Sequence, residues 1–434
     1  IRGGGREGDG KAVLRMKGGR RDSGDQRSGE GRMRGSGGTI TGRGTQGSGR
    51  DDCGMTGGTG GALQQGDNID TFRRSGGRII GAFEDGDQAW MTGGRIGRVN
   101  MKLDKNLWDQ SGGTVDGNVV TGFDTDTIII SGTAYIGGNI SVSGGNDSVT
   151  ITDGTVRGQV LLSTGNDTFN WNGGGIVYGA IDGGPDDDVA NLSNLNQANL
   201  GAVPLFDGGS GNDQLNFNNV KATGVARFQN WEAISLASST ELTFDGNLVI
   251  GDSGTGTGTL TLDDTSTLYA GNGAHAVRPF AAGARVDVFN AGRIDLTGTG
   301  AGDVFTIRGN YRGDGGGLYL RTVLAGDGAS SDRLVIDGGT ASGTTGIGIL
   351  NPGGGRDATL ADGILVVQAL TRGSTAANAF SLFAPVSAGS SEHFLLQGAV
   401  RHGTRAPGSL RSTPAAGPSP PPTGDGYAPP QPPH

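Results

Sequence analysis

The sequence predicts an all-β solenoid in which short strands wind in coils of about 20 residues. The first observation is a repeated corner, because Gly-Asn-Asp and Pro-Asp-Asp motifs place Asp147, Asp167 and Asp187 at successive intervals of 20 residues. The second is that residues between the corners alternate between apolar and polar, as strands do, without helical spacing. The third is composition, since 89 glycines and only 33% hydrophobic residues suit a narrow interior better than a deep core.

Residues 1–78 open the chain with glycine and arginine and show neither a strand period nor a helix period. Such a composition buries too little apolar surface to offset the ordering of the backbone, so we expect this segment to be disordered. Residues 1–80 carry 15 Lys+Arg against 9 Asp+Glu, whereas the remainder carries 19 against 34. The alternative is an RGG-like arm that binds RNA. It lacks interleaved aromatic residues, and the acidic body argues against nucleic acid as a partner.

Residues 79–303 are predicted to form the coils. One coil buries only a few apolar side chains, worth about 2 kcal/mol each, which does not offset the ordering of its backbone. The coils must therefore stack through parallel hydrogen bonds. The inward-facing set is expected to be Ile80, Trp90, Ile96, Val99, Val115, Val119, Ile128, Ile130, Ile136 and Ile140. The corner interval lengthens between Asp187 and Asp213, where a loop is expected to bulge out.

Residues 304–400 hold longer apolar strands, such as VFTIRGNY and GILVVQAL, and are predicted to cap the C-terminal end of the stack. Residues 401–434 are rich in proline and are predicted to be an extended, unfolded linker. The single cysteine, Cys53, excludes a disulfide framework. No apolar run approaches the roughly 18 residues of a transmembrane helix.

A family resemblance is carried by six motifs within residues 228–400: FQNWEAISL, LTFDGNLVIGDSGTGTGTLTL, VFNAGRIDL, FTIRGNYRGDGGGLYLRTVL, SDRLVIDGGTASGTT and DGILVVQA. This segment resembles the passenger domains of type V autotransporters, the pertactin-like group, and the last four motifs are similar to the family's C-terminal β-helix cap, its autochaperone segment. The resemblance implies a right-handed parallel β-helix at the bacterial cell surface or outer membrane, or secreted from it. It also implies a parent protein tethered by a translocator β-barrel, which we expect to be missing from this chain.

The function implied by this resemblance is that of a non-enzymatic passenger in adhesion or host interaction, with host surface or matrix molecules as partners. A passenger enzyme such as a hydrolase stays open as an alternative, as does a structural stalk or the product of a decayed gene. The GDSG sequence around Ser253 resembles the surroundings of a serine-protease nucleophile. All four histidines follow Ser253, however, so the order needed for a chymotrypsin-like base is lacking and no catalytic residue is assigned.

A weak candidate binding motif is the tripeptide Arg312-Gly313-Asp314, the sequence that extracellular adhesins present to integrins. Three residues recur often by chance in a chain rich in all three. We expect this copy to lie at a turn between two cap strands, where Gly313 serves the turn.

Weak calcium candidates are the corner acids Asp147, Asp167, Asp187 and Asp213, because GGSGNDQLN resembles a calcium-binding repeat. That repeat needs tandem nine-residue units, whereas a spacing near 20 leaves one acid per coil. We therefore expect these acids to act as turn formers at solvated corners, with calcium as the alternative and no other cofactor.

The four tryptophans, Trp90, Trp108, Trp171 and Trp231, lie beside inward apolar residues. They are expected to fill the coil interior. A sugar-stacking groove is the alternative.

Overall fold

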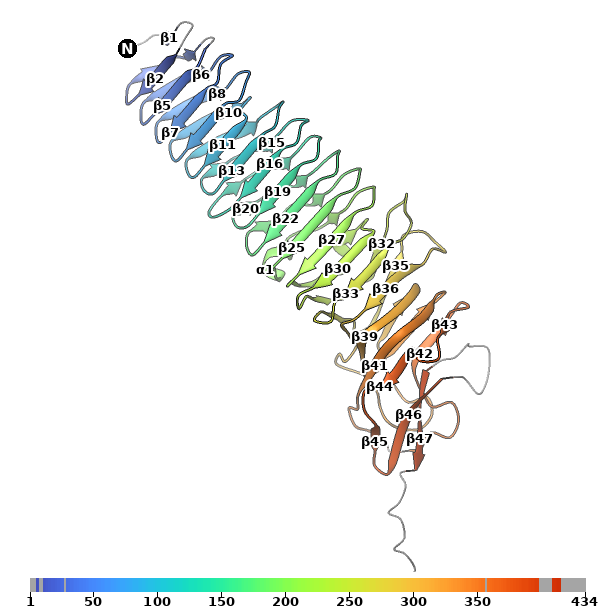
Figure 1. Ribbon diagram of the computed structural model, residues 1–434. Helices are drawn as coiled ribbons and strands as arrows, with labels where there is room; N and C mark the ends of the chain where they lie inside the picture. Colours follow the sequence, from blue (N-terminus) through green and yellow to red (C-terminus); the bar gives the residue numbers. More distant parts are fainter. Residues whose placement is uncertain (1–4, 8–10, 27–28, 356, 398–407, 415–434) are drawn as a thin grey trace, which may run out of the picture.

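The computed structural model shows coils stacked along one axis, from the N-terminal end to a broader C-terminal unit (Figure 1). It describes residues 5–7, 11–26, 29–355, 357–397 and 408–414. Consecutive coils pair through parallel strands, as in the pairing of Ser148–Ile151 with Thr168–Trp171. The predicted parallel β-solenoid is confirmed.

The strands form three sheets along the axis. The second sheet runs through most of the chain, whereas the first lies within residues 5–229 and the third within residues 248–414. The first sheet contains β1 (Gly5–Glu7), β3 (Arg20–Arg21), β4 (Gly24–Gln26), β6 (Thr39–Thr45), β8 (Thr59–Gln64), β10 (Arg78–Glu84), β12 (Arg95–Asn100), β14 (Thr114–Val115), β15 (Val119–Val120), β17 (Tyr135–Ile136), β18 (Ile140–Ser141), β20 (Thr155–Val156), β21 (Val160–Leu161), β23 (Ile176–Val177), β24 (Ile181–Asp182), β26 (Phe206–Asp207) and β29 (Phe228–Gln229). The second contains β2 (Ala12–Met16), β5 (Gly31–Gly35), β7 (Asp52–Met55), β9 (Thr71–Arg74), β11 (Gln88–Met91), β13 (Leu107–Gln110), β16 (Thr127–Ile130), β19 (Ser148–Ile151), β22 (Thr168–Asn172), β25 (Val189–Ser193), β27 (Gln214–Asn218), β28 (Lys221–Thr223), β30 (Ala233–Ala237), β31 (Glu241–Thr243), β33 (Thr259–Leu262), β34 (Thr267–Tyr269), β36 (Val286–Asn290), β37 (Arg293–Asp295), β39 (Gly309–Arg321), β41 (Thr340–Leu350), β43 (Ser374–Thr375) and β44 (Phe380–Leu382). The third contains β32 (Leu248–Ile250), β35 (Ala274–Pro279), β38 (Val304–Ile307), β40 (Arg333–Asp337), β42 (Ile364–Leu370), β45 (Val386–Ala388), β46 (Ser391–Gln397) and β47 (Gly408–Pro414).

The core is a column of side chains that repeat at the same position in each coil. Trp108 pairs in register with Ile128, Ile128 with Val149, and Val149 with Phe169. All four are at most 1% exposed. Each inward side chain is thus covered mainly by its counterparts in neighbouring coils, which lets an interior one side chain wide exclude water.

Two members of the predicted inward set face outward. Ile80 is 59% exposed, and Trp90 lies on the outer face of β11, whereas Ile79 and Ala89 are buried in their place. A shift of one residue moves every side chain of a strand to the opposite face. At Ile79-Ile80 and Ala89-Trp90 two apolar residues are adjacent, so alternation alone does not decide which one points inward.

The predicted disorder of residues 1–78 is corrected by the described residues of this segment, which form coils like those that follow. The strands from β1 to β9 lie within it, and β2, β5, β7 and β9 pair in sequence. Part of the missing apolar bulk is replaced by a buried ladder of amides. Gln46 Nε2 donates to Gln26 Oε1 at 3.2 Å, and Gln65 Nε2 donates to Gln46 Oε1 at 3.1 Å. Hydrogen bonding along the axis satisfies polar groups that would otherwise make this interior unfavourable.

A Ser/Thr-Gly-Gly repeat marks successive coils, including those within residues 1–78 that the composition did not predict. Its copies begin at Ser36, Thr56, Ser75, Thr92 and Ser111. The second glycine of each copy has a positive φ between 74° and 87°, which favours glycine. The first glycine lies against a carbonyl of the preceding coil, and a Cβ on Gly76 would stand 2.4 Å from Thr56 O.

A Gly76→Ala substitution is expected to destabilise the N-terminal coils by about 1–3 kcal/mol, because the new methyl group overlaps backbone that cannot rotate away. Gly18 is the matched control, since it occupies the equivalent position three coils earlier and a Cβ there would meet nothing within 4 Å. Limited proteolysis followed by mass spectrometry would measure both. Early cleavage within residues 20–100 is expected only for the Gly76 variant, and equal resistance of the two variants would contradict the packing argument.

The lengthened interval after Asp187 contains a short helix in place of an irregular loop. Helix α1 (Gln197–Leu200) begins after Asn196, whose side chain accepts a hydrogen bond from Ala198 N–H. Leu200 is 1% exposed, so the helix contributes to the core while it projects from the coil (Figure 1). A 3₁₀ turn, η1 (Val225–Arg227), follows in the next coil.

The C-terminal unit is built on the two longest strands of the second sheet, β39 and β41, which pair along most of their length. The predicted linker, residues 401–434, is corrected in part: residues 408–414 form β47, which pairs antiparallel with β42 and β46. Leu410 is fully buried there, and the alternation in GSLRS accounts for this strand. Residues 401–407 and 415–434 lie outside the described residues.

Candidate functional site

A ladder of carboxyl groups runs through the interior of the solenoid, with one side chain per coil. The backbone N–H of Asp147 donates to Asp167 Oδ1 at 2.7 Å, and that of Asp167 donates to Asp188 Oδ1 at 2.8 Å. Each carboxylate therefore accepts a hydrogen bond from the backbone N–H of the ladder residue in the preceding coil. The remaining members are Asp51, Asp70, Asp87, Asp126, Asp213 and Glu232.

The predicted solvated corners are corrected on two counts. The ladder carboxyls are buried, with Asp147 2% and Asp213 0% exposed, and the ladder passes through Asp188 while its neighbour Asp187 faces solvent. Burial raises the pKa of Asp147 to about 6 and that of Asp167 to about 8, against a lowering effect of the backbone hydrogen bonds. The 20-residue spacing located the corner correctly. Because Asp187 and Asp188 are adjacent, however, the spacing did not indicate which of the two points inward.

The calcium hypothesis for these acids stays a prediction. Asp147, Asp167 and Asp213 stand in one column, each with one oxygen engaged by a backbone N–H. Asp187 lies outside that column, and its Oδ1 accepts from Asn212 N–H at 2.8 Å. Within the described ranges, no group of three or more His, Cys, Asp or Glu side chains is arranged to hold a metal ion.

The RGD tripeptide lies inside a strand, where a turn was expected. Arg312, Gly313 and Asp314 belong to β39, between β36 and β41, and Gly313 is buried. Arg312 Nε donates to Asp314 Oδ1 at 2.8 Å. The two charged side chains thus bind each other on one face of a continuous sheet.

Ser253 is exposed, and the adjacent Asp252 has a local structural role. Asp252 Oδ1 accepts hydrogen bonds from the backbone N–H groups of Gly254 and Thr255, at 2.8 and 2.6 Å. No hydrogen bond between Ser253 and a histidine occurs in the described part of the chain. This turn chemistry accounts for the GDSG sequence without a catalytic role.

Three of the four tryptophans fill the core, because Trp108, Trp171 and Trp231 are at most 1% exposed. Trp90 differs. It faces solvent at the N-terminal end of the second sheet, and the Arg73 guanidinium carbon lies 4.5 Å from the centre of its ring.

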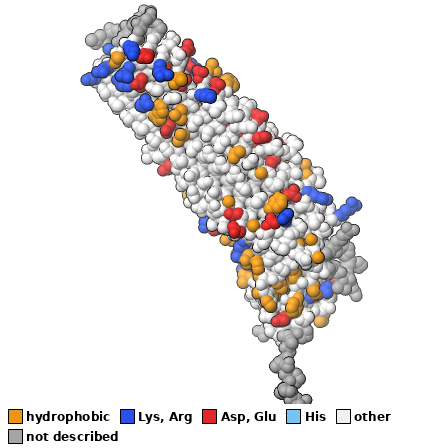
Figure 2. Space-filling model, in the orientation of Figure 1, with side chains coloured by type: hydrophobic (Ala, Val, Ile, Leu, Met, Phe, Trp, Pro, Cys, Tyr) orange, Lys and Arg blue, Asp and Glu red, His pale blue; other side chains and the backbone are white. Residues whose placement is uncertain are grey.

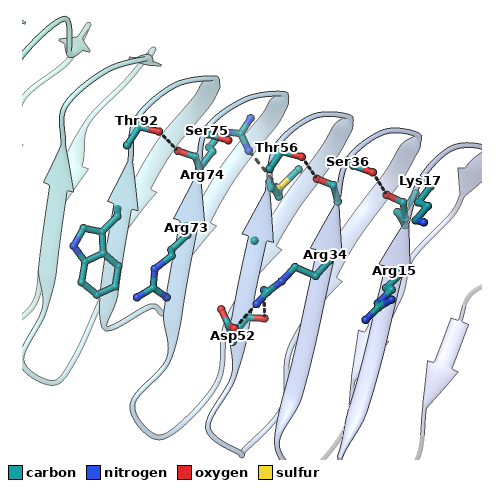
Figure 3. Close-up of a pocket in the computed structure, with 15 residues that line it drawn as sticks. Arg15, Lys17, Arg34, Ser36, Asp52, Thr56, Arg73, Arg74, Ser75 and Thr92 are labelled. Carbon is teal, nitrogen blue, oxygen red and sulfur yellow. Dashed lines mark hydrogen bonds and ion pairs between the residues drawn. The ribbon is translucent and has the colours of Figure 1, made fainter.

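Trp90 borders a groove of about 520 Å³ that β2, β5, β7, β9 and β11 form together (Figure 3). The parallel register aligns one outward column across these strands: Arg15, Arg34, Gly54, Arg73 and Trp90. Because Gly54 has no side chain, the Arg34 side chain lies across it, and a Cβ there would stand 3.0 Å from Arg34 Nη1. Five cations line the groove, against the single acid Asp52. The sequence did not point to this site, because residues 1–78 were predicted to be disordered.

Comparison with known proteins gives the class of the chain. Residues 289–395 match the family described as Autochaperone Domain Type 1. The chain is 28% identical over 326 residues, 67% of its length, to the Adhesin BmaC autotransporter of Brucella suis biovar 1 (strain 1330). A shorter match, 42% identical over 74 residues, is to the uncharacterized protein YuaQ of Escherichia coli (strain K12).

The fold and the C-terminal match define a parallel β-helix that ends in an autochaperone domain. Together with the similarity to an autotransporter adhesin, they support an autotransporter passenger as the class of this chain. The matched regions amount to 17% and 67% of this chain but to only 5% and 9% of the two relatives. No helix among the described residues has the length and apolar character needed to cross a membrane.

Proposed function

We propose that the chain is a non-enzymatic passenger, displayed on the surface of a Gram-negative bacterium or released from it, that acts in adhesion to host surfaces or matrix. The observation that carries the proposal is the similarity to a named adhesin across two thirds of the chain. The architecture supports it, because a solenoid presents a long face of repeated side chains on a rigid axis, a form suited to extended ligands.

The test is attachment of cultured epithelial cells to the purified chain immobilised on a surface, with the heat-unfolded chain as control. Saturable attachment that requires the folded chain is expected. Attachment no greater than that to the unfolded chain, for both cells and purified matrix proteins, would overturn the proposal.

Within this assay, Asp314→Glu is expected to attach as well as the unsubstituted chain. The Arg312–Asp314 pair is held in a strand with neighbours on both sides, so the tripeptide is not presented as a flexible loop. A loss of most attachment in this variant would restore the RGD hypothesis.

A further inference from the structure

The groove beside Trp90 contains cations for which the fold supplies no acidic partner. Arg34 pairs with Asp52. Arg15 and Arg73, in contrast, are exposed, and neither forms an ion pair with a carboxylate within the described ranges. Figure 2 shows Lys and Arg side chains gathered at this end of the visible face, while the middle coils carry few.

A buried guanidinium is the second, independent feature of this groove. Arg74 lines it from the face of β9 opposite to Arg73, where it is only 2% exposed, and no carboxylate pairs with it in the described part of the chain. Its Nη2 donates to Arg95 O at 3.0 Å, while Nε has no hydrogen-bond partner. Burial lowers the pKa of Arg74 to about 10. A buried cation without a counter-charge costs stability, which an anionic ligand would offset.

We propose that this groove binds an acidic polysaccharide, a linear glycan that carries sulfate or uronate groups. Arg15 and Arg73 stand three strands apart in one column, about 14 Å at the strand spacing of a sheet. A chain of anionic sugars lying along the solenoid axis would meet a guanidinium near each end of the groove. Guanidinium groups bind sulfate and carboxylate through paired hydrogen bonds.

The surroundings of the cations favour a sugar over a nucleic acid. Met16, Met55 and Trp90 give the groove apolar surface suited to the C–H faces of sugar rings. A row of hydroxyls borders it, including Ser36, Thr56 and Thr92 (Figure 3). Nucleic-acid binders place several aromatic side chains along the strand, whereas this groove has one, which Arg73 covers on one face.

This inference names a ligand class for the proposed adhesive function and rests on it, yet the two can fail separately. Attachment of cells without glycan binding would contradict the proposed glycan site but leave the proposed adhesive function standing. Binding of glycan without attachment of cells would contradict the proposed adhesive function but leave the glycan site standing.

The experiment measures binding of heparin oligosaccharides to the purified chain by calorimetry at two salt concentrations. Arg15→Ala/Arg73→Ala is expected to raise the Kd at least ten-fold and to reduce its salt dependence. The matched control is Arg20→Ala/Arg78→Ala, which removes two exposed arginines three strands apart in one column of the first sheet. Its Kd is expected to change less than two-fold.

Three results would overturn the proposal: no heparin binding by the unsubstituted chain, equal losses in the two double variants, or equally tight binding of a single-stranded oligonucleotide through the same arginines. An unchanged circular dichroism spectrum establishes that each variant is folded.

Arg74→Met separates a binding role from a structural one. The variant is expected to melt at or above the temperature of the unsubstituted chain, because it removes a buried unpaired charge, and to bind heparin at least three-fold more weakly. A lower melting temperature with unchanged binding would show that Arg74 only supports the fold, and would contradict its assignment to the site.

Discussion

The β-helix is expected to be less stable at pH 8 than at pH 5, by more than about 3 kcal/mol, because several ladder carboxyls titrate between these values and each pKa unit is worth about 1.4 kcal/mol. Burial raises the pKa of Asp147 to about 6, of Asp188 to about 7, and of Asp167 and Asp213 to about 8. The folded chain therefore binds more protons than the unfolded chain between about pH 4 and pH 8. Stability from the ladder is fully present below the unfolded pKa and is lost as the pH rises through the folded values.

Below about pH 4 an opposite effect sets in. The hydrogen bond from Arg34 lowers the pKa of Asp52, so the stability of that pair is present above the unfolded pKa and is lost in acid. The maximum is accordingly expected in mild acid. Thermal melts followed by circular dichroism from pH 4 to pH 9 would measure it, and a melting temperature that rises steadily from pH 5 to pH 8 would contradict the ladder.

Two neighbouring substitutions isolate this effect. Asp188→Asn should raise the melting temperature at pH 8 and flatten its pH dependence, since an amide keeps the acceptor for the Asp167 N–H and carries no charge. Asn106 already occupies the equivalent place, where its N–H donates to Asp126 Oδ1 at 2.8 Å while its own Oδ1 accepts no hydrogen bond. Asp187→Asn is the control, because Asp187 is exposed and should leave the slope unchanged. Interchanged results would mean that Asp187 is the inward member after all.

Strand period and corner spacing made the architecture predictable, because a solenoid repeats its local chemistry in every coil. The direction of individual side chains was less predictable. Where two acidic or two apolar residues are adjacent, as in Asp187-Asp188 or Ala89-Trp90, the alternating pattern does not indicate which of them points inward. Contact with the coil above and below makes that choice.

The basic groove could not be predicted from amino-acid composition, for a different physical reason. Disorder was inferred from a shortage of apolar side chains, but the coils within residues 1–78 obtain part of their cohesion from buried amides and close glycine contacts. The Ser/Thr-Gly-Gly repeat was the available signal. Once the coils are in register, Arg15, Arg34 and Arg73 form a column, although 58 residues separate the first from the last.

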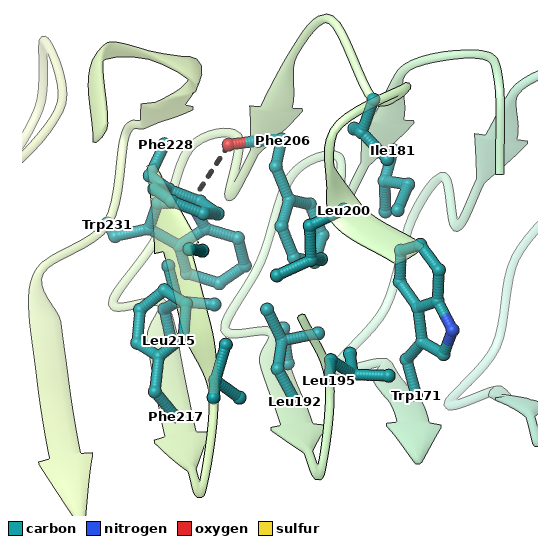
Figure 4. Close-up of a cluster of buried hydrophobic side chains, with 14 of the residues drawn as sticks. Trp171, Ile181, Leu192, Leu195, Leu200, Phe206, Leu215, Phe217, Phe228 and Trp231 are labelled. Carbon is teal, nitrogen blue, oxygen red and sulfur yellow. Dashed lines mark hydrogen bonds between the residues drawn. The ribbon is translucent and has the colours of Figure 1, made fainter. Parts of the chain in front are cut away.

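Replacement of Phe206 by alanine is expected to produce the largest loss of stability from a single core residue, about 3–5 kcal/mol. Phe206 is 1% exposed, and its ring centre lies 5.7 Å from that of Phe169, 6.1 Å from that of Phe228 and 5.5 Å from that of Trp231. It occupies the middle of an aromatic cluster where helix α1 joins the coil (Figure 4). The substitution removes buried apolar area and three ring contacts together, each worth about 0.5–1.5 kcal/mol.

The position of this cluster should also change how the chain unfolds. In a solenoid each coil contacts only its neighbours, so cooperativity depends on every interface between coils. A cavity at Phe206 weakens the junction between the coils before it and those leading to the autochaperone domain. We therefore expect denaturant unfolding of Phe206→Ala to separate into two transitions, measured by circular dichroism together with hydrogen exchange of the two halves. Phe123→Ala is the control, because its ring is 71% exposed and should leave the curve unchanged. A single transition shifted as a whole would contradict this expectation. It would show that the backbone hydrogen bonds between strands, and not the aromatic cluster, couple the coils on either side of Phe206.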